Sequence, residues 1–251
     1  MIGEVEFQKL GAKAESAARA AGNLLYRSMD SKLVVEEFRR DIKLNVDTET
    51  EDEIIGILSG DIPILCEEKG WVGASAQTYW IVDGLDGTVN YHRDIPLSCV
   101  SIALIVSGIP TIGVIYDYIH DEMFSGILEL GSSLNGSPIK VSDTTDVSKG
   151  LLLTALSTKS EFSNPSLFKF SQGLGQWHKV RMLGTAALSM SYLAAGRADA
   201  CQIKDIMFWD VAAGIAIVNA AGGRVVTEFS ESNILDVDAD NGVLKREYGQ
   251  S

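Results

Sequence analysis

Cysteine is scarce in this chain, whose 251 residues include three, at Cys66, Cys99 and Cys201. No two of them have the C-x-x-C spacing of a zinc or redox motif, and their wide separation argues against a disulfide framework. Their neighbours are largely apolar, and a free thiol among apolar side chains behaves as a small core residue. We therefore expect buried, reduced thiols and an intracellular, cytoplasmic location.

Long apolar segments and an excess of positive charge are also missing. No apolar run reaches the roughly 20 residues that a membrane helix needs, and Glu4 and Glu6 stand where a secretory signal would be apolar. Lys and Arg number 21 against 34 Asp and Glu, a formal net charge of −13. Proteins that bind duplex nucleic acid are typically basic. We expect no nucleic-acid or membrane partner, and the acidity fits local recruitment of cations or simple solubility.

The length of the chain allows a substantial core, in one domain or in two lobes. Residues 97–128 hold three β-rich runs with short turns, which predict antiparallel hairpins. Residues 129–150 are rich in Gly, Ser, Thr and Asp and form the most natural boundary between lobes. Strands and helices alternate afterwards, so we predict an α+β lobe over 1–145 and an α/β lobe over 146–251.

The N-terminal part shows three patterns. Apolar residues recur with a period near 3.6 from residue 4 to about residue 29 and predict an amphipathic helix. Residues 30–47 are charged and irregular, which favours a solvated loop, with a mobile flap over a site as the alternative. Their charged residues include Arg39, Arg40, Asp41 and Lys43. A short helix follows over residues 48–58, where acids at its start favour the helix dipole.

The stretch from residue 80 to residue 91, W-I-V-D-G-L-D-G-T-V-N-Y, organises the rest of the chain. Its first three residues predict a buried strand that ends in Asp83 and Asp86, with glycines that permit a tight loop. Two carboxylates in a loop with free carbonyls suit Mg²⁺ or Mn²⁺. The N–H groups around Gly87 and Thr88, if they open a helix, would face an anion such as phosphate. A turn whose Asp residues only cap the backbone is the alternative.

Other charged residues occur in similar contexts further along the chain. Glu67 ends a short apolar strand and so repeats the arrangement at Asp83, although a charged turn would also explain it. Asp210 stands at the start of a predicted helix, where capping alone is a sufficient reason. Arg181 and Lys204 lie near the ends of later elements, where they meet solvent or else a second phosphate or a sugar acid.

Several patterns resemble those of the inositol monophosphatase family, whose superfamily includes fructose-1,6-bisphosphatases and 3′-phosphoadenosine nucleotidases. The family signature, D-P-[IL]-D-G-T-x-N after a W-[IV]-[IV] strand, is matched at 83–90, with Gly84 in place of the proline. Residues 66–68 are similar to G-E-E or S-E-E, residues 184–187 to G-[ST]-A-A, and residues 209–214 to W-D-x-A-A-G.

This resemblance implies a fold, an assembly and a metal site. The fold would be a layered α-β-α-β-α sandwich of the sugar phosphatase type in two lobes, and the assembly a homodimer. The active site would hold two or three Mg²⁺ ions, with Mn²⁺ as an alternative. The implied metal ligands are Glu67, Asp83, the carbonyl oxygen of Leu85, Asp86 and Asp210.

The resemblance also assigns catalytic and substrate-binding residues. Glu67 and the Thr88 hydroxyl would orient and deprotonate the attacking water. Glu51 would supply a further acid, and Asp47 and Asp52 compete with it for that role. The implied substrate contacts are Asp86, Gly87, Thr88, Gly184, Thr185 and Ala186, with Arg181 and Lys204 as further candidates.

The implied activity is metal-dependent hydrolysis of a small sugar or polyol phosphate, inositol-1-phosphate or fructose-1,6-bisphosphate. Many inositol-preferring members have a Glu at the position that Ile203 occupies here, which leaves room for a bisphosphorylated sugar. A 3′(2′),5′-bisphosphate nucleotidase, an NADP phosphatase, or a glycerol or histidinol phosphate as substrate are alternatives. Outside catalysis, the alternatives are a non-enzymatic metal-binding regulator and a Ca²⁺-binding module, for which an EF-hand pattern is missing.

Overall fold

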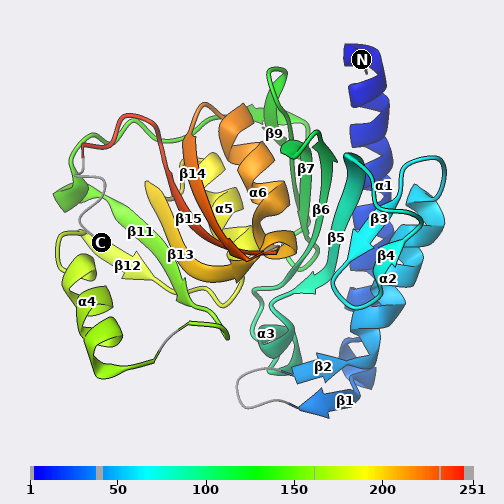
Figure 1. The fold of residues 1–251 in the computed structure, drawn as a ribbon, viewed down its shortest axis with the longest axis horizontal. Helices are drawn as coiled ribbons and strands as arrows, with labels where there is room; N and C mark the ends of the chain where they lie inside the picture. Colours follow the sequence, from blue (N-terminus) through cyan, green and yellow to red (C-terminus); the bar gives the residue numbers. More distant parts are fainter. Residues whose placement is uncertain (1–2, 38–41, 161, 232, 246–251) are drawn as a thin grey trace.

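The computed structural model describes residues 3–37, 42–160, 162–231 and 233–245 and arranges them in five layers (Figure 1). Two helices cover the outer face of an eight-stranded sheet, and two more lie between that sheet and a five-stranded one. A further helix lies beside the outer face of the second sheet. This arrangement confirms the predicted α-β-α-β-α sandwich.

The larger sheet is almost entirely antiparallel. In sheet order its strands are β10 (Ser137–Ile139), β9 (Gly131–Leu134), β8 (Glu122–Ile127), β7 (Ile109–Asp117), β6 (Cys99–Val106), β5 (Thr78–Asp86), β3 (Ile64–Cys66) and β4 (Gly70–Val72). The consecutive strands β6, β7 and β8 confirm the hairpins predicted for residues 97–128. Within this sheet β3 and β5 run parallel, so their C-terminal ends lie side by side.

Helices α1 (Glu4–Arg27) and α2 (Asn45–Leu58) cover one face of this sheet. The buried stripe of α1 consists largely of alanines, which lets the helix approach the sheet closely. At Gly22 the approach is closest, since an added Cβ would lie 2.6 Å from Cδ1 of Tyr116. One apolar core fills this interface, and β5 belongs to it through Trp80 and Val82.

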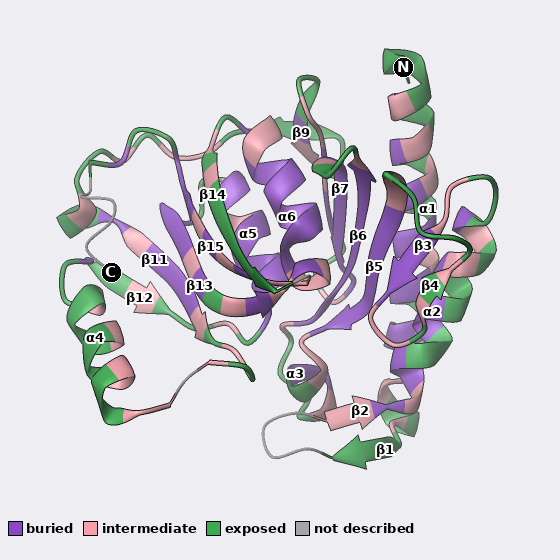
Figure 2. Cartoon of the chain, in the orientation of Figure 1, coloured by how far each residue is buried: buried purple, intermediate pink, exposed green. Residues whose placement is uncertain are grey.

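Helices α5 (Ala186–Ala194) and α6 (Phe208–Ala220) form the middle layer and are almost wholly buried (Figure 2). Small residues let the layers touch. An added Cβ at Gly113 of β7 would lie 2.1 Å from the carbonyl oxygen of Ala213, and one at Gly214 would lie 2.3 Å from Cβ of Met190. Helix α6 is therefore pressed against the larger sheet, which fixes where its first turn lies.

The smaller sheet combines parallel and antiparallel pairs. In sheet order its strands are β12 (Lys179–Arg181), β11 (Leu151–Leu156), β13 (Ala200–Met207), β15 (Ile234–Asp240) and β14 (Arg224–Glu231). The first three strands are parallel and the last two pair antiparallel with their neighbours. Helix α4 (Asn164–Leu174) belongs to the outermost layer, and the short helix α3 (Thr88–His92) follows β5.

The structure differs from the sequence expectations in two places. The loop expected over residues 30–47 contains a 3₁₀ turn η1 (Met29–Ser31), a hairpin of β1 (Val34–Glu37) and β2 (Ile42–Leu44), and the start of α2. Its Arg39, Arg40 and Asp41 lie outside the described residues. The segment expected as a lobe boundary, residues 129–150, contains β9, β10 and the 3₁₀ turn η2 (Val147–Lys149), and strand β15 is not among the elements predicted from the sequence. The division into two lobes at residue 145 stays a prediction.

The cysteine prediction is confirmed, because all three thiols are buried and free. Burial raises the pKa of Cys66 and that of Cys201 to about 12, so both remain neutral thiols near neutral pH. Within the described ranges, no helix combines the length and the apolar character needed to cross a membrane.

Candidate active site

The parallel pairing of β3 and β5 places two acids at the neighbouring C-terminal ends of these strands. Cys66 lies opposite Val82, and the N–H of Glu67 donates to the carbonyl oxygen of Val82 over 3.2 Å. Glu67 and Asp83 therefore follow directly on neighbouring strand ends. The sequence pattern of an apolar strand followed by an acid, which occurs at Glu67 and again at Asp83, therefore places the two carboxylates close together.

A β-bulge at the end of β5 separates the two aspartates of the signature. Asp83 lies opposite Ser101 and Asp86 opposite Cys99, so three residue steps on β5 face two on β6. A bulge bends its strand and redirects the side chains beside it. Here it follows Asp83, whose Oδ1 accepts a 2.9 Å hydrogen bond from the Leu85 N–H across the bulge.

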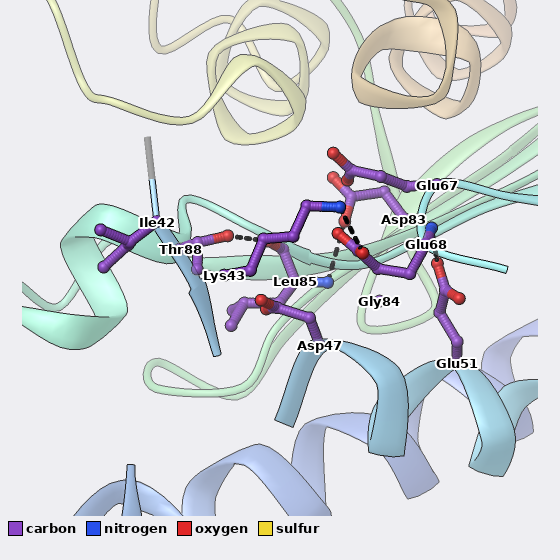
Figure 3. A pocket seen from close by; sticks show the side chains of 10 residues that line it. All are labelled: Ile42, Lys43, Asp47, Glu51, Glu67, Glu68, Asp83, Gly84, Leu85 and Thr88. Atoms are coloured by element: carbon purple, nitrogen blue, oxygen red, sulfur yellow. Dashed lines mark hydrogen bonds and ion pairs between the residues drawn. The ribbon is translucent and has the colours of Figure 1, made fainter. Parts of the chain in front are cut away.

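Helix α6 adds a third acid from a distant part of the chain. Asp210 lies in its first turn, and Ser101 Oγ donates to the carbonyl oxygen of Trp209 over 3.3 Å, which ties the helix start to β6. Carboxylate oxygens of Glu67, Asp83 and Asp210 all lie within 4.8 Å of one another. In Figure 3 the side chains of Glu67 and Asp83 lie side by side at the pocket.

Burial and mutual repulsion make this an electrostatically unfavourable cluster without a cation. Asp83 is only 2% exposed. Burial, together with the charges of Glu67, Asp86 and Asp210, raises its pKa well above the usual range. Buried carboxylate oxygens that repel one another are hard ligands for which a divalent cation restores charge balance. The donor set therefore fits a divalent metal.

Asp86 is held by the start of α5. Its Oδ2 accepts hydrogen bonds from Thr185 Oγ1 over 2.5 Å and from the Ala187 N–H over 2.7 Å. Burial raises its pKa to about 6, and the hydrogen bonds from Thr185 and from backbone N–H groups, including those of Ala186 and Gly87, oppose that rise. Thr185 and Ala186, which the resemblance assigns to substrate, thus contact Asp86.

Asn90 locks the signature loop to the segment before α5. Its Nδ2 donates to the carbonyl oxygens of Leu97 and Leu183, each over 2.8 Å. An added Cβ at Gly184 would lie 2.8 Å from that same nitrogen, so this position has no room for a side chain. Gly184 therefore permits close packing of α3 against the chain that leads into α5.

Gly84, which replaces the proline of the resembled family, is explained by a neighbour on α2. An added Cβ there would lie 2.6 Å from Thr50 Oγ1. That hydroxyl donates to the carbonyl oxygens of Val46 and Asp47, so it cannot move without losing both hydrogen bonds. Gly84 therefore leaves room for the threonine.

The three candidates for a further acid have different surroundings. Asp47 and Glu51 line the pocket, whereas Asp52 forms an ion pair with Lys69 at 3.0 Å. Asp47 Oδ2 accepts from the Leu44 N–H over 2.6 Å, the arrangement of an acid in the third position of a helix. That position at the start of α2 is the signal by which Asp47 could be singled out.

Glu51 has a backbone role in the structure. It is 1% exposed, and its carboxylate accepts from the N–H groups of Glu68 and Lys69 over 2.8 and 3.1 Å. In Figure 3 its side chain rises from α2 to the main chain of Glu68. Burial raises its pKa from 4.5 to about 7, against the opposing effect of the two N–H groups.

This pKa makes a pH prediction for Glu51→Gln. The folded-state pKa lies above the unfolded one, so folding takes up a proton between about pH 4.5 and 7. Wild-type stability that is present below this window is lost as pH rises through it, by up to about 3 kcal/mol. We expect the unfolding free energy of the variant, relative to that of wild type, to increase by that amount as the pH rises through this window. Urea titrations from about pH 4 to pH 8 in EDTA measure it, and a constant difference contradicts it.

The remaining predicted residues divide between pocket and surface. The pocket is lined by ten residues, among them Leu85 and Thr88, whose Oγ1 donates to the Leu85 carbonyl oxygen over 3.1 Å. Arg181 and Lys204 are exposed and lie outside that lining. Lys43 lines the pocket too. The sequence shows it only as one charge in an irregular segment.

Comparison with known proteins gives one consistent family. The model of the inositol monophosphatase family matches residues 7–248. An inositol-1-monophosphatase of Synechocystis is 35% identical over 95% of this chain and 86% of its own length. The Nus factor SuhB of Xylella fastidiosa is 38% identical over 83% of this chain and 78% of its own length.

A solved structure agrees with these sequence relatives. The inositol monophosphatase of Anabaena sp. PCC 7120 superposes with a TM-score of 0.82 and 33% identity, covering 94% of this chain and 92% of that one. The match of the family model spans nearly the whole chain, and it includes every strand end that carries an acid of the cluster. The chain therefore belongs to the inositol monophosphatase family, a family of phosphoric monoester hydrolases.

Proposed function

We propose that this protein is a Mg²⁺-dependent phosphomonoesterase that hydrolyses a small sugar or polyol phosphate. The observation that carries the proposal is the convergence of Glu67, Asp83 and Asp210 from three elements, with oxygens within 4.8 Å of one another. A structural role does not call for three acids at one point, because unneutralised carboxylates repel one another. A pair of divalent cations, by contrast, needs such ligands.

The proposed ligands extend this cluster to both sides. Glu67, Asp83, Asp86, Asp210 and the carbonyl oxygen of Leu85 would hold two or three Mg²⁺ ions, and Mn²⁺ would bind the same oxygens. When bound, the metal would supply Lewis acidity toward water and toward the phosphoryl oxygens. The hydrogen bonds from Thr185 and Ala187 orient Asp86 for this role, since they engage only its Oδ2.

Thr88 and Glu67 would handle the attacking water. Thr88 donates its only hydroxyl proton to Leu85, so the lone pairs of its Oγ1 remain to accept a hydrogen bond from water. Glu67 would take the proton that this water loses. Asp47 lies in the same pocket and would assist there, whereas Glu51 would act as a positioning residue through the backbone of Glu68 and Lys69.

The substrate would lie between the first turn of α3 and the C-terminal ends of the smaller sheet. The first N–H groups of a helix lack partners within it. The Gly87 N–H is engaged by Asp86, so those that follow it at the start of α3 would face the phosphate. Arg181 ends β12 and Gly184 follows it, while Lys204 lies within β13 opposite Leu156, the last residue of β11. These residues would contact the rest of the ester. The positively charged side chains of Arg181 and Lys204 would suit a second phosphate group.

The names of the relatives leave the activity to be settled by assay. One is called an inositol-1-monophosphatase and another a Nus factor. The complete set of acids in this chain favours catalysis over a purely regulatory role, because a regulator has no chemical need for the cluster. A homodimer stays a prediction.

A phosphate-release screen tests the proposal. The purified protein would be assayed with Mg²⁺, with Mn²⁺ and with EDTA on inositol-1-phosphate, fructose-1,6-bisphosphate, NADP and 3′-phosphoadenosine-5′-phosphate. We expect Mg²⁺-dependent release, highest on one of the first two. Highest release on a nucleotide would instead support the nucleotidase alternative, and no release on any substrate in the presence of bound metal would support a non-catalytic role.

A further inference from the structure

Lys43 is the single base among the ten residues that line the pocket. It lies on β2, in the short hairpin that precedes α2, opposite Glu36 of β1. Figure 3 shows its side chain extending across the pocket to Glu68. A charged side chain placed among acids at a cation site affects how many cations the site can take.

The contact of Lys43 with Glu68 is direct. Its Nζ lies 2.6 Å from Glu68 Oε2, and the side chains are 39% and 16% exposed. The carboxylates of Glu68, Glu67 and Glu36 raise the pKa of Lys43, so the ammonium stays charged over the neutral range. The fixed positive charge therefore neutralises part of the acidity on the Glu68 side of the pocket.

Glu68 follows Glu67 immediately, and its carboxylate is a hard oxygen ligand at the pocket. If Lys43 were absent, Glu67 and Glu68 would together offer an additional cation position beside the cluster of Glu67, Asp83 and Asp210. An ammonium held at this position excludes a hydrated divalent ion by charge and by volume. The ammonium of Lys43, paired with Glu68, would thus take the place of one metal ion.

We propose that Lys43 is a positioning residue that occupies the Glu68 side of the site and limits the number of divalent ions the protein binds. This inference rests on the metal site of the proposed function. It concerns how the site is filled rather than which ester it cleaves.

Counting bound Mn²⁺ tests the proposal directly. Equilibrium dialysis with metal analysis, and titration of free Mn²⁺ by its electron paramagnetic resonance signal, would be applied to wild type and to Lys43→Met, Lys43→Arg and Lys43→Met/Glu68→Gln. We expect Lys43→Met to bind about one ion more per chain than wild type at low millimolar Mn²⁺. Lys43→Arg should keep the wild-type number because it keeps the charge, and the double variant should return to it because Glu68 no longer contributes a charged ligand.

Lys69→Met is the matched control. It removes the same charge two positions from Glu67, but its ammonium pairs with Asp52, outside the pocket lining. Its ion count should equal that of wild type.

The outcomes separate the two proposals. Wild type that binds no Mn²⁺ would overturn both the metal site and the role of Lys43. Equal counts and affinities in wild type and Lys43→Met would overturn the role of Lys43 alone. A Lys43→Met variant with an unchanged ion count and a raised KM for phosphate ester would also overturn it, because Lys43 would then be a substrate contact.

Discussion

Asp210→Asn is expected to lower kcat by about 10³-fold or more, equivalent to about 4 kcal/mol of transition-state stabilisation. The substitution keeps the size of the side chain but removes the charge that closes the acid cluster from the α6 side. Metal-free Asp210→Asn should fold at least as well as wild type, because the Asp210 charge is one of those that raise the pKa of Asp83. Asp83→Asn should lose activity to a similar extent.

Steady-state phosphate release, with thermal unfolding in EDTA, measures both effects. Asp238→Asn is the matched control, since that carboxylate lies in β15 and accepts from Gln202 Nε2 over 3.3 Å. Its activity should be unchanged. Near-normal Mg²⁺-dependent rates in Asp83→Asn and Asp210→Asn would contradict the assigned chemistry.

Gly87→Ala is expected to reduce both stability and activity, because the residue joins β5 to α3 in a left-handed conformation. Its φ is +93°, and an added Cβ would lie 2.9 Å from the carbonyl oxygen of Leu97. The conformation alone costs a non-glycine residue about 1–2 kcal/mol, and the clash forces the loop to shift. We expect a loss of about 2–3 kcal/mol in unfolding free energy and, because the Gly87 N–H helps hold Asp86, a fall in kcat of at least about 10-fold.

Gly108→Ala is the control that separates the cost of a positive φ from the cost of the steric clash at Gly87. Gly108 has a φ of +83° in the turn between β6 and β7, and nothing lies within 4 Å of an added Cβ. This variant should lose only the conformational part of the stability and keep wild-type activity. If Gly87→Ala behaved like Gly108→Ala in urea unfolding and in phosphate release, the close fit at Gly87 would have no functional weight.

The layered sandwich was expected from the resemblance to the family, whereas apolar periodicity and turn residues predicted many of its individual elements. The hairpins of residues 97–128 and the alternation after residue 150 appear at the expected places. The hairpin of β1 and β2 was not predicted, because β1 is short and fully exposed and β2 has only three residues, of which Leu44 alone is buried. Strand β15 alternates acids with buried apolar residues, which is the pattern of a half-buried strand, but the sequence analysis did not assign it.

Some residues of the candidate site could be predicted from local sequence patterns, whereas the placement of others depends on tertiary contacts. The strand-to-acid pattern at Glu67 and Asp83 is local, and the parallel pairing of β3 with β5 turns it into proximity. The approach of Asp210 depends on Ala213 and Gly214, which belong to the same motif, and on Gly113 of β7, which lies far from it in the sequence. The pairing of Glu51 with backbone N–H groups and of Lys43 with Glu68 depends on tertiary contacts alone. Sequence patterns thus identified the acids but could not distinguish ligands from residues that hold the loop.

Crystals soaked in Mn²⁺, with data collected near the manganese absorption edge, offer the most direct test of the metal site. Anomalous peaks about 2 Å from carboxylate oxygens of Glu67, Asp83 and Asp210 are the predicted result. Manganese bound elsewhere on the protein, with these three carboxylates left uncoordinated, would contradict the account.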